Sequence, residues 1–174
     1  MRKAVFSSLL CVILLTSFSR EALAQNQIGK FIKDTAKEVA LDPTTYAPFG
    51  TSWLGKQVDW NSSQVFFRNG YVEANPDFTV SRLPNDKPIS HSDGNLKLIK
   101  ISLPVLQLSL INNTAASIVE RLLIRQYPNR EKLVKIIGWA EKIAVNSYFA
   151  YTYSHRNFSQ WQTNKIMARE LGLK

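Results

Sequence analysis

The sequence predicts an all-α protein, a bundle of about four to five helices around a long helical hairpin, with one long irregular loop at about 75–95. Three observations support this fold class. Apolar residues recur at helical spacing along most of the chain, a Pro-Asn pair separates the two longest such segments, and turn-forming residues are concentrated in one stretch. We therefore expect a single helical domain over residues 25–174, preceded by a signal peptide at 1–24.

The N-terminus has the three parts of a secretory signal. A basic start, Met1-Arg2-Lys3, is followed by an uncharged apolar run over residues 4–18 and by the small-x-small site Ala22-Leu23-Ala24. These features predict cleavage between Ala24 and Gln25. An uncleaved anchor is the alternative, and it is disfavoured because the apolar run is shorter than the roughly 20 residues that a spanning helix needs.

Export limits the chemistry and the partners of the mature chain. Cleavage removes Cys11, the one cysteine, so neither an internal disulfide nor a thiolate is available. The formal charge is +9 for the whole chain. In a cytosolic protein such an excess would indicate nucleic acid, which export makes an unsuitable partner. Anionic lipid headgroups, acidic glycans or simple solubility remain as explanations.

The first two helices are predicted from their apolar faces. A helix over about 27–41 places Ile28, Phe31 and Val39 on one side, and Asp42-Pro43 ends it because the residue before proline avoids the helical region. A second helix is possible over about 51–68, where Trp53, Trp60 and Phe67 recur every seven residues. That recurrence is typical of a core stripe. Prolines and Asp93-Gly94-Asn95 then predict the long loop.

The hairpin follows the loop. One helix is expected from about 95 or 104 to 127, with a polar line at spacing four through Ser109, Asn113, Ser117 and Arg121. Pro104 is tolerable in a first turn and would kink a helix that began earlier. A second helix is expected over about 130–154, and a separate last helix over about 157–171 with Asn157 as its N-cap.

The hairpin raises the question of a membrane. Residues 101–119 carry no charge, and a basic connector with Arg121, Arg125, Arg130, Lys132 and Lys135 follows them. A span of this kind would place the connector on the cytoplasmic side. Glu141 and Lys142 argue against spanning, because each charge at a bilayer centre costs about 2.5 to 3.5 kcal/mol on insertion scales.

Several short motifs lie between residues 59 and 157. The main motif is Asp59-Trp60-Asn61-Ser62-Ser63, then Gly70 and Glu73-Ala74-Asn75-Pro76, and weaker ones follow at Glu120-Arg121, Ile136-Ile137-Gly138 and His155-Arg156-Asn157. Together they resemble the motifs of a family of uncharacterised small multi-pass bacterial membrane proteins. This sequence has Ser63 where the family usually has threonine, and its helices are more polar. The resemblance implies a membrane-embedded helical architecture and brings no known activity.

The sequence contains few groups that could carry chemistry. The only histidines are His91 and His155, and neither a metal-binding motif nor a Gly-x-Ser-x-Gly or phosphate-binding loop is present. We therefore expect no metal site and no cofactor. One candidate polar site can be named, and its residues are Asp59, Glu73, Asn75, Glu120, Arg121 and His155.

These six residues also have a structural interpretation. Glu73 would then pair with an arginine, and Asn75-Pro76 would form the turn that ends a helix. In an antiparallel hairpin His155 would lie near residues 97–103 and would not meet Arg121 directly.

The sequence favours a non-enzymatic, exported envelope protein. We expect it in the periplasm, associated with or embedded in the inner membrane, with membrane lipid headgroups as partners and no nucleic acid. The alternative is an enzyme or small-ligand-binding protein with a site around Asp59 and Glu73. That alternative requires Trp53, Trp60 and Phe66 to line a pocket.

Overall fold

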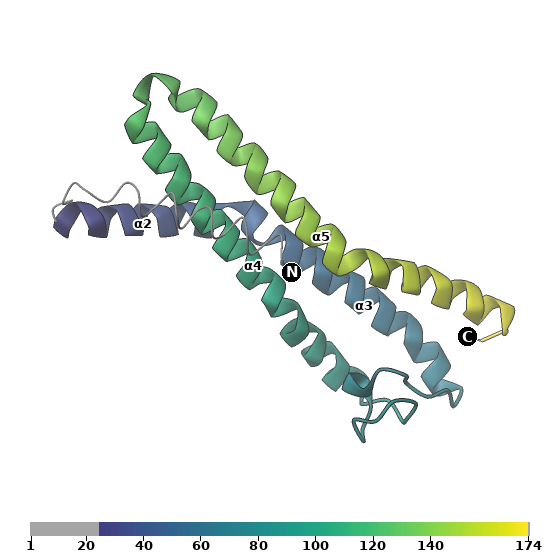
Figure 1. Ribbon diagram of the computed structural model, residues 1–174. Coiled ribbons are helices and arrows are strands. Elements are labelled where there is room, and N and C mark those ends of the chain that lie inside the picture. Colours follow the sequence, from purple (N-terminus) through teal and green to yellow (C-terminus); the bar gives the residue numbers. More distant parts are fainter. Residues whose placement is uncertain (1–24, 174) are drawn as a thin grey trace. The chain divides into compact units, whose positions relative to one another are not determined.

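The computed structural model describes residues 25–173 and confirms the all-α fold class. Its helices are α2 (Gln25–Leu41), α3 (Ala47–Arg68), α4 (His91–Gln126) and α5 (Glu131–Glu170) (Figure 1). Three short 3-10 turns join them: η1 (Pro43–Thr45), η2 (Pro76–Phe78) and η3 (Pro128–Arg130). The predicted signal peptide and Ala24 lie outside the described residues.

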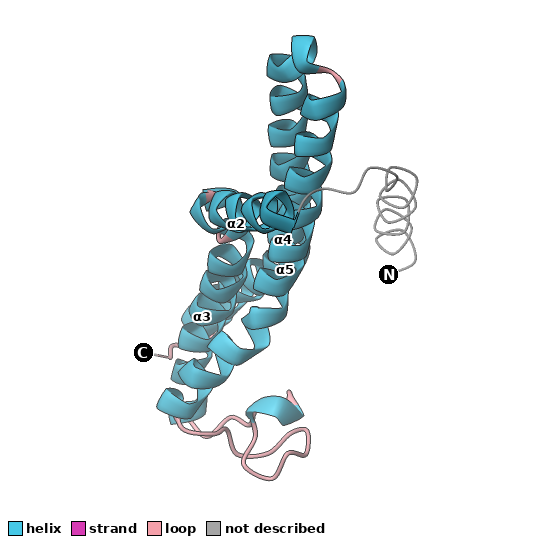
Figure 2. Cartoon of the chain, turned by 90° about the vertical axis from the view of Figure 1, so that its left-hand side faces the viewer, coloured by secondary structure: helices cyan, strands magenta, loops and turns pink. Residues whose placement is uncertain are grey.

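The chain forms two compact units that share α4 and α5. Unit 1 contains the described residues as far as Tyr46 together with Leu108–Asn146, and unit 2 contains Ala47–Gln107 and Ser147–Lys174. Unit 1 therefore holds α2 and the closed end of the hairpin, which we call the hairpin tip (108–146). Unit 2 holds α3, the loop 69–90 and the open ends of the two long helices (Figure 2).

In unit 1, α2 packs across the hairpin tip and ends in a capped turn. The side chain of Asp42 accepts a hydrogen bond from the backbone N–H of Thr44 at 2.9 Å, and Pro43 occupies the first position of η1. The predicted end of this helix at Asp42-Pro43 is thus confirmed to the residue. Thr45 closes the turn by donating its hydroxyl to the carbonyl of Val39 at 2.8 Å.

Unit 2 has an aromatic core on α3. Trp60, Phe78 and Leu98 are buried together, and Trp53 and Phe67 pack against them. The rings of Trp60 and Phe78 lie 5.1 Å apart. The seven-residue stripe is therefore a core stripe as predicted, and Trp60 fills a core instead of lining a pocket.

The prediction that Asp93-Gly94-Asn95 forms a turn is wrong, because α4 already begins at His91. Ser90 caps the helix, since its hydroxyl accepts a hydrogen bond from the N–H of Asp93 at 3.1 Å and also bonds the Asp93 carboxylate. The cap satisfies the Asp93 N–H, one of the first-turn donors that have no partner within the helix. Gly94 is needed for packing, because a Cβ atom there would lie 2.3 Å from the Trp60 ring.

The long helices are more continuous than predicted. Pro104 lies inside α4, and α5 passes through residues 155–157 without a break. Ser154 and Asn157 bond back to the carbonyls of Ala150 and Tyr153, one turn earlier in the same helix. Polar side chains that bond in this way remain within a helix, so Asn157 is not the N-cap that the sequence predicts.

Candidate functional site

The buried residues of this protein are mostly polar. Among the described residues, twelve buried side chains are polar or charged and six are hydrophobic. The buried polar or charged side chains of α4 and α5 belong to serine, asparagine and lysine residues: Ser102, Ser109, Asn113, Ser117, Lys142, Asn146, Ser154 and Asn164. A buried polar group is costly unless it is hydrogen-bonded, so the interactions of these residues define the candidate sites.

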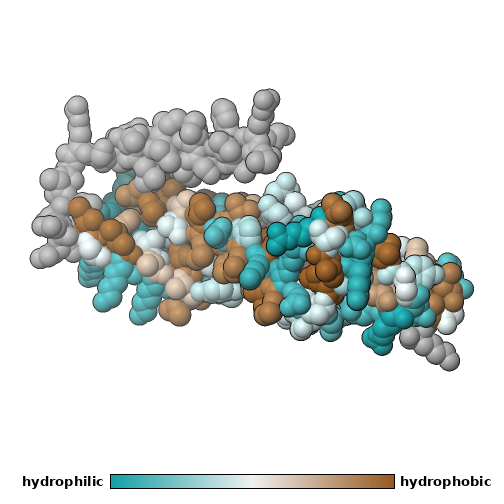
Figure 3. Space-filling view, turned by 90° about the horizontal axis from the view of Figure 1, so that it is seen from below, coloured by the Kyte–Doolittle hydropathy of each residue, from teal (hydrophilic) through white to brown (hydrophobic). Residues whose placement is uncertain are grey.

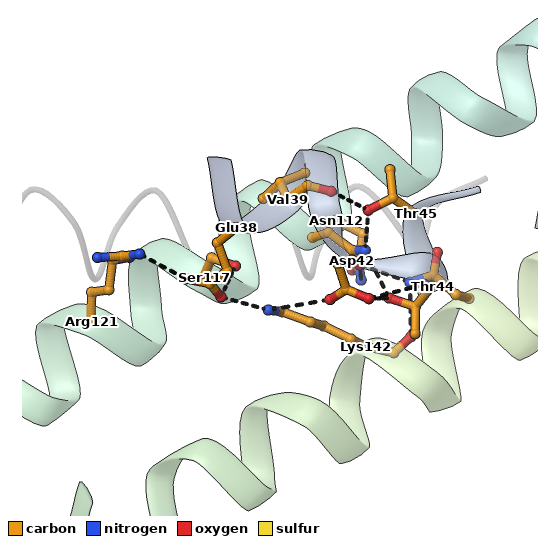
Figure 4. Close-up of polar contacts among 11 residues, drawn as sticks. Glu38, Val39, Asp42, Thr44, Thr45, Asn112, Ser117, Arg121 and Lys142 are labelled. Atoms are coloured by element: carbon orange, nitrogen blue, oxygen red, sulfur yellow. Dashed lines mark hydrogen bonds and ion pairs between the residues drawn. The ribbon is translucent and has the colours of Figure 1, made fainter. Parts of the chain in front are cut away.

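Glu38 is the centre of a charged network in unit 1 (Figure 4). Its carboxylate accepts hydrogen bonds from the Ser117 hydroxyl at 2.8 Å, from Arg121 at 2.8 Å and from Lys142 Nζ at 3.0 Å. Lys142 Nζ also lies 3.7 Å from Asp42. Glu38 and Asp42 come from the end of α2, so this network attaches α2 to both helices of the hairpin tip.

A second group of hydrogen bonds continues the network toward η1. The Asn113 side-chain amide donates to the hydroxyls of Thr44 at 2.9 Å and Thr45 at 2.8 Å. The Asn146 amide donates to Asn113 Oδ1 at 2.7 Å. Asn113 on α4 and Asn146 on α5 therefore connect the two helices of the hairpin through uncharged amides.

The pKa values of Glu38 and of Glu120, which lies beside the network, shift in opposite directions. Burial alone would raise the pKa of Glu38, but hydrogen bonds from Lys142 and Ser117 outweigh it and hold that pKa below its ordinary value. Burial raises the pKa of Glu120, and the nearby charge of Lys142 opposes this shift only partly. The hydrogen bonds therefore favour the charged form of Glu38, whereas burial disfavours the charged form of Glu120.

A cavity of about 690 Å³ lies beside this network in unit 1, between α2, α4 and α5. Four cationic and four carboxylate side chains line it together with two apolar ones, and we call it the charged cavity. Its lining residues are Lys30, Phe31, Asp34, Glu38, Glu120, Arg121, Ile124, Arg125, Glu131 and Lys135.

Four of the predicted site residues, Asp59, Glu73, Asn75 and His155, lie in unit 2. Asp59 accepts a hydrogen bond from the amide of Asn164 at 3.1 Å, and the same amide reaches the hydroxyls of Ser62 and Ser63. Burial and the negative charge of Glu73 raise the pKa of Asp59 to about 6. The short motif 59–63 thus forms a polar contact between α3 and α5.

Glu73 and Asn75 order the loop that follows α3. Glu73 Oε1 accepts from the N–H of Asn75 at 2.7 Å, and Asn75 Oδ1 accepts from the N–H of Asp77 at 3.0 Å. Asn75 is thereby the cap of η2. These contacts match the structural interpretation of Asn75-Pro76 as a turn, although the turn begins a 3-10 helix instead of ending an α-helix.

Glu120, Arg121 and His155 do not join the other predicted residues in one group. Glu120 and Arg121 line the charged cavity of unit 1. His155 belongs to unit 2, where its ring stacks on Tyr151 with centroids 4.6 Å apart and its Nδ1 atom lies 2.9 Å from the Tyr151 carbonyl oxygen.

Sequence reasoning missed Glu38 and Lys142, the two central charges of unit 1. Glu38 is not among the candidate site residues, and Lys142 enters only as a charge that argues against a membrane span. The usable signal was the polar line through Asn113, Ser117 and Arg121, because a line of polar residues on an apolar helix needs polar partners.

Lys56, Ser52 and Ser102 resemble a catalytic group, but a substrate cannot reach them. Lys56 Nζ donates to the hydroxyls of Ser52 and Ser102, and burial lowers the pKa of Lys56. Both serines are 0% exposed. A nucleophile must reach its substrate, so this contact is a structural link between α3 and α4. No cluster of three or more possible metal ligands occurs within residues 25–173.

No family model matches the chain, and neither a curated protein nor a solved structure was found to resemble it.

Proposed function

We propose that this protein is an exported, non-enzymatic envelope protein that binds the surface of the inner membrane through its hairpin tip. The observation that carries the proposal is the combination of a polar interior with an apolar exterior at the tip. Ile136, Ile137 and Trp139 are 63%, 58% and 62% exposed within about one turn near the start of α5. Leu110, Ile111, Leu123 and Leu133 are further exposed apolar side chains of the hairpin tip.

Such a surface is unusual for a protein that only meets water. Exposed apolar side chains that occur singly need no explanation, but several on one element mark a contact with a membrane or a protein. Figure 3 shows hydrophobic residues interspersed with hydrophilic ones on the outer surface. Serine and asparagine at buried helix contacts are also typical of helices that pack in lipid.

The charges of the tip favour a membrane over a protein partner. Arg125, Arg130, Lys132 and Lys135 are exposed around the turn between α4 and α5, beside the apolar residues. Basic residues close to an apolar helix face attract anionic headgroups, and tryptophan prefers the headgroup region. These residues together provide both parts of an interfacial binding surface.

Helix α4 is consistent with contact to lipid. It is the one helix within residues 25–173 that is long and apolar enough to cross a membrane, and 28% of its most apolar window is buried. Length and composition alone are weak evidence for a span. Binding at the surface leaves Glu38 and Lys142 inside the protein, where they are paired, and avoids placing them in hydrocarbon.

Co-sedimentation of the mature chain with lipid vesicles tests this function. We expect binding to vesicles that contain phosphatidylglycerol. The double substitution Ile136→Asn/Ile137→Asn should weaken binding about tenfold, since it removes two exposed apolar contacts. Ile166→Asn is the matched control, because Ile166 is 56% exposed on the same helix but lies in unit 2. A wild-type chain that stays in solution contradicts the proposal.

The cellular part of the proposal has its own measurement. Fractionation of cells that express the full chain should recover the protein with the inner membrane, and its N-terminal residue should be Gln25. Recovery of nearly all of it from the periplasm by osmotic shock without detergent would contradict membrane association. An uncleaved N-terminus would contradict the predicted signal peptidase site.

A further inference from the structure

Some of the charged side chains that line the charged cavity take no part in its internal ion pairs. Arg121 pairs with Glu38 at 2.8 Å and Lys135 pairs with Glu131 at 2.6 Å. The remaining charged groups are two cations, Lys30 and Arg125, and two carboxylates, Asp34 and Glu120. None of these four forms an ion pair with another residue in the part of the chain that the structure describes.

A buried donor beside these groups also has no partner. The Nε atom of Arg121 is buried and donates no hydrogen bond to the protein within residues 25–173. Buried donors are nearly always satisfied by protein, water or ligand. Because this atom is closed off from solvent, it contributes to the wall of the charged cavity and does not contact a molecule bound there.

The balance of charges selects the kind of molecule. An anion alone would meet Asp34 and Glu120, and a cation alone would meet Lys30 and Arg125. Like charges brought together in a partly buried site oppose binding. A small zwitterion can place its negative group near the cations and its positive group near the carboxylates, so it satisfies both pairs at once.

We propose that the charged cavity binds a molecule with a phosphodiester and a primary ammonium group, the chemistry of a phosphoethanolamine lipid headgroup. The phosphate lies near the unpaired cations Lys30 and Arg125, and the ammonium group lies near Glu120 and Asp34. Phe31 and Ile124 provide apolar contact for the carbon atoms of the molecule. This inference rests on the proposed membrane function and names the lipid that the hairpin tip selects.

Calorimetric titration with soluble headgroups tests the inference without vesicles. We expect glycerophosphoethanolamine to bind more tightly than glycerophosphocholine, which cannot donate hydrogen bonds from its ammonium group, and more tightly than glycerol phosphate, which has no cation. Arg125→Gln and Glu120→Gln should each weaken its binding about tenfold, because each removes one charge-assisted contact. Lys33→Gln is the control, since Lys33 is an exposed cation on α2 of the same unit that neither lines the cavity nor belongs to the basic tip.

The two substitutions should also differ in selectivity. Glu120→Gln should remove the preference for glycerophosphoethanolamine over glycerol phosphate, whereas Arg125→Gln should weaken both. Circular dichroism of each variant checks that the helices remain folded. Equal binding of all three headgroups, or no binding of any with folded protein, overturns the inference.

Vesicles distinguish this inference from the proposed function. Replacing part of the phosphatidylcholine by phosphatidylethanolamine in vesicles with constant phosphatidylglycerol should strengthen binding of the wild-type chain and leave Glu120→Gln unchanged. Vesicle binding without any effect of phosphatidylethanolamine overturns the headgroup assignment and retains the membrane function. Binding of soluble glycerophosphoethanolamine without vesicle binding supports the cavity assignment, identifies a soluble source for the ligand and contradicts the membrane function.

Discussion

Lys142 shows how a single side chain decides the packing of unit 1. Its Nζ atom lies 3.0 Å from Glu38 and 3.7 Å from Asp42, and its side chain is 5% exposed. A lysine buried to this extent is stable only when it is paired. Both partners come from the end of α2, so the charge on α5 specifies where α2 crosses the hairpin.

Replacing Lys142 tests this role. We expect Lys142→Met to lower the free energy of unfolding by about 2 kcal/mol, below the 3 to 5 typical of a broken buried pair, because Glu38 keeps Ser117 and Arg121 as donors. Lys135→Met removes the exposed ion pair with Glu131 and should leave stability nearly unchanged. Urea unfolding followed by circular dichroism provides both values. Equal losses for the two variants would show that burial of the Lys142 charge has no special role.

Asp59 makes the stability of unit 2 dependent on pH. Its pKa is raised to about 6 from 3.8 by burial and by the charge of Glu73, so the folded state binds a proton more tightly than the unfolded state. Stability should therefore fall as pH rises between about 4 and 6. The free energy of unfolding of Asp59→Asn should match that of the wild-type chain near pH 4. Above pH 7 it should be higher by about 1 to 2 kcal/mol, a figure reduced because the Asp59 side chain is partly exposed.

The second cause of this shift has a separate test. Glu73→Gln removes the neighbouring negative charge, so the Asp59 carboxyl should titrate at a lower pH than in the wild-type chain. NMR titration of the Asp59 side chain measures this directly. An unchanged midpoint would mean that burial alone raises the pKa.

Part of this residue-scale description could be predicted from the sequence. The stripe of Trp53, Trp60 and Phe67 was predicted as core because its spacing determines its face. The partners of Glu38 could not be predicted, since they depend on where α2 crosses two helices that lie about 80 to 100 residues further along the chain. Periodicity within one helix does not contain that information.

The first turn of α4 is the element that sequence signals describe least well. Ser90 and Asp93 are a recognisable capping pair, but Gly94 and Asn95 together with the preceding prolines favoured a loop. The contact of Gly94 with Trp60 decides the outcome, because the helix brings its backbone against the ring. Such a contact between distant segments cannot be seen in local composition.

Substitution of this glycine tests the contact. A Cβ atom at Gly94 would lie 2.3 Å from the Trp60 ring, so the ring or the helix has to move. We expect Gly94→Ala to lower the free energy of unfolding by about 1 to 3 kcal/mol, the range for overpacked sites. Gly50→Ala on α3 meets no atom within 4 Å and should stabilise the chain slightly. Urea unfolding followed by tryptophan fluorescence measures the stability of both variants. If Gly94→Ala does not change the free energy of unfolding, the helix must lie further from Trp60 than the structure places it.

At the scale of the whole molecule, polarity is distributed in an unusual way. Buried side chains are predominantly polar, while Ile136, Ile137 and Trp139 are exposed. The sequence showed an uncharged stretch at 101–119 and a basic connector, but it could not show which side of each helix is buried. The structure places serines and an asparagine of α4 inside, and several of its apolar residues, among them Ile99, Leu103 and Ile111, are exposed.

This distribution predicts two separable contributions to membrane binding. Raising the salt concentration from about 0.1 M to 1 M shortens the screening length from about 10 Å to 3 Å, so it should remove the attraction between the basic tip and anionic lipid. Binding to phosphatidylglycerol vesicles should weaken at least about tenfold but persist, because apolar contacts are not screened. The blue shift of Trp139 fluorescence on binding, identified by difference from Trp139→Phe, reports the apolar part. This blue shift should persist at high salt in the wild-type chain. It should disappear in Ile136→Asn/Ile137→Asn. If salt alone abolishes both sedimentation and the blue shift, the membrane attracts only the charges of the tip, and its exposed apolar residues must meet another partner.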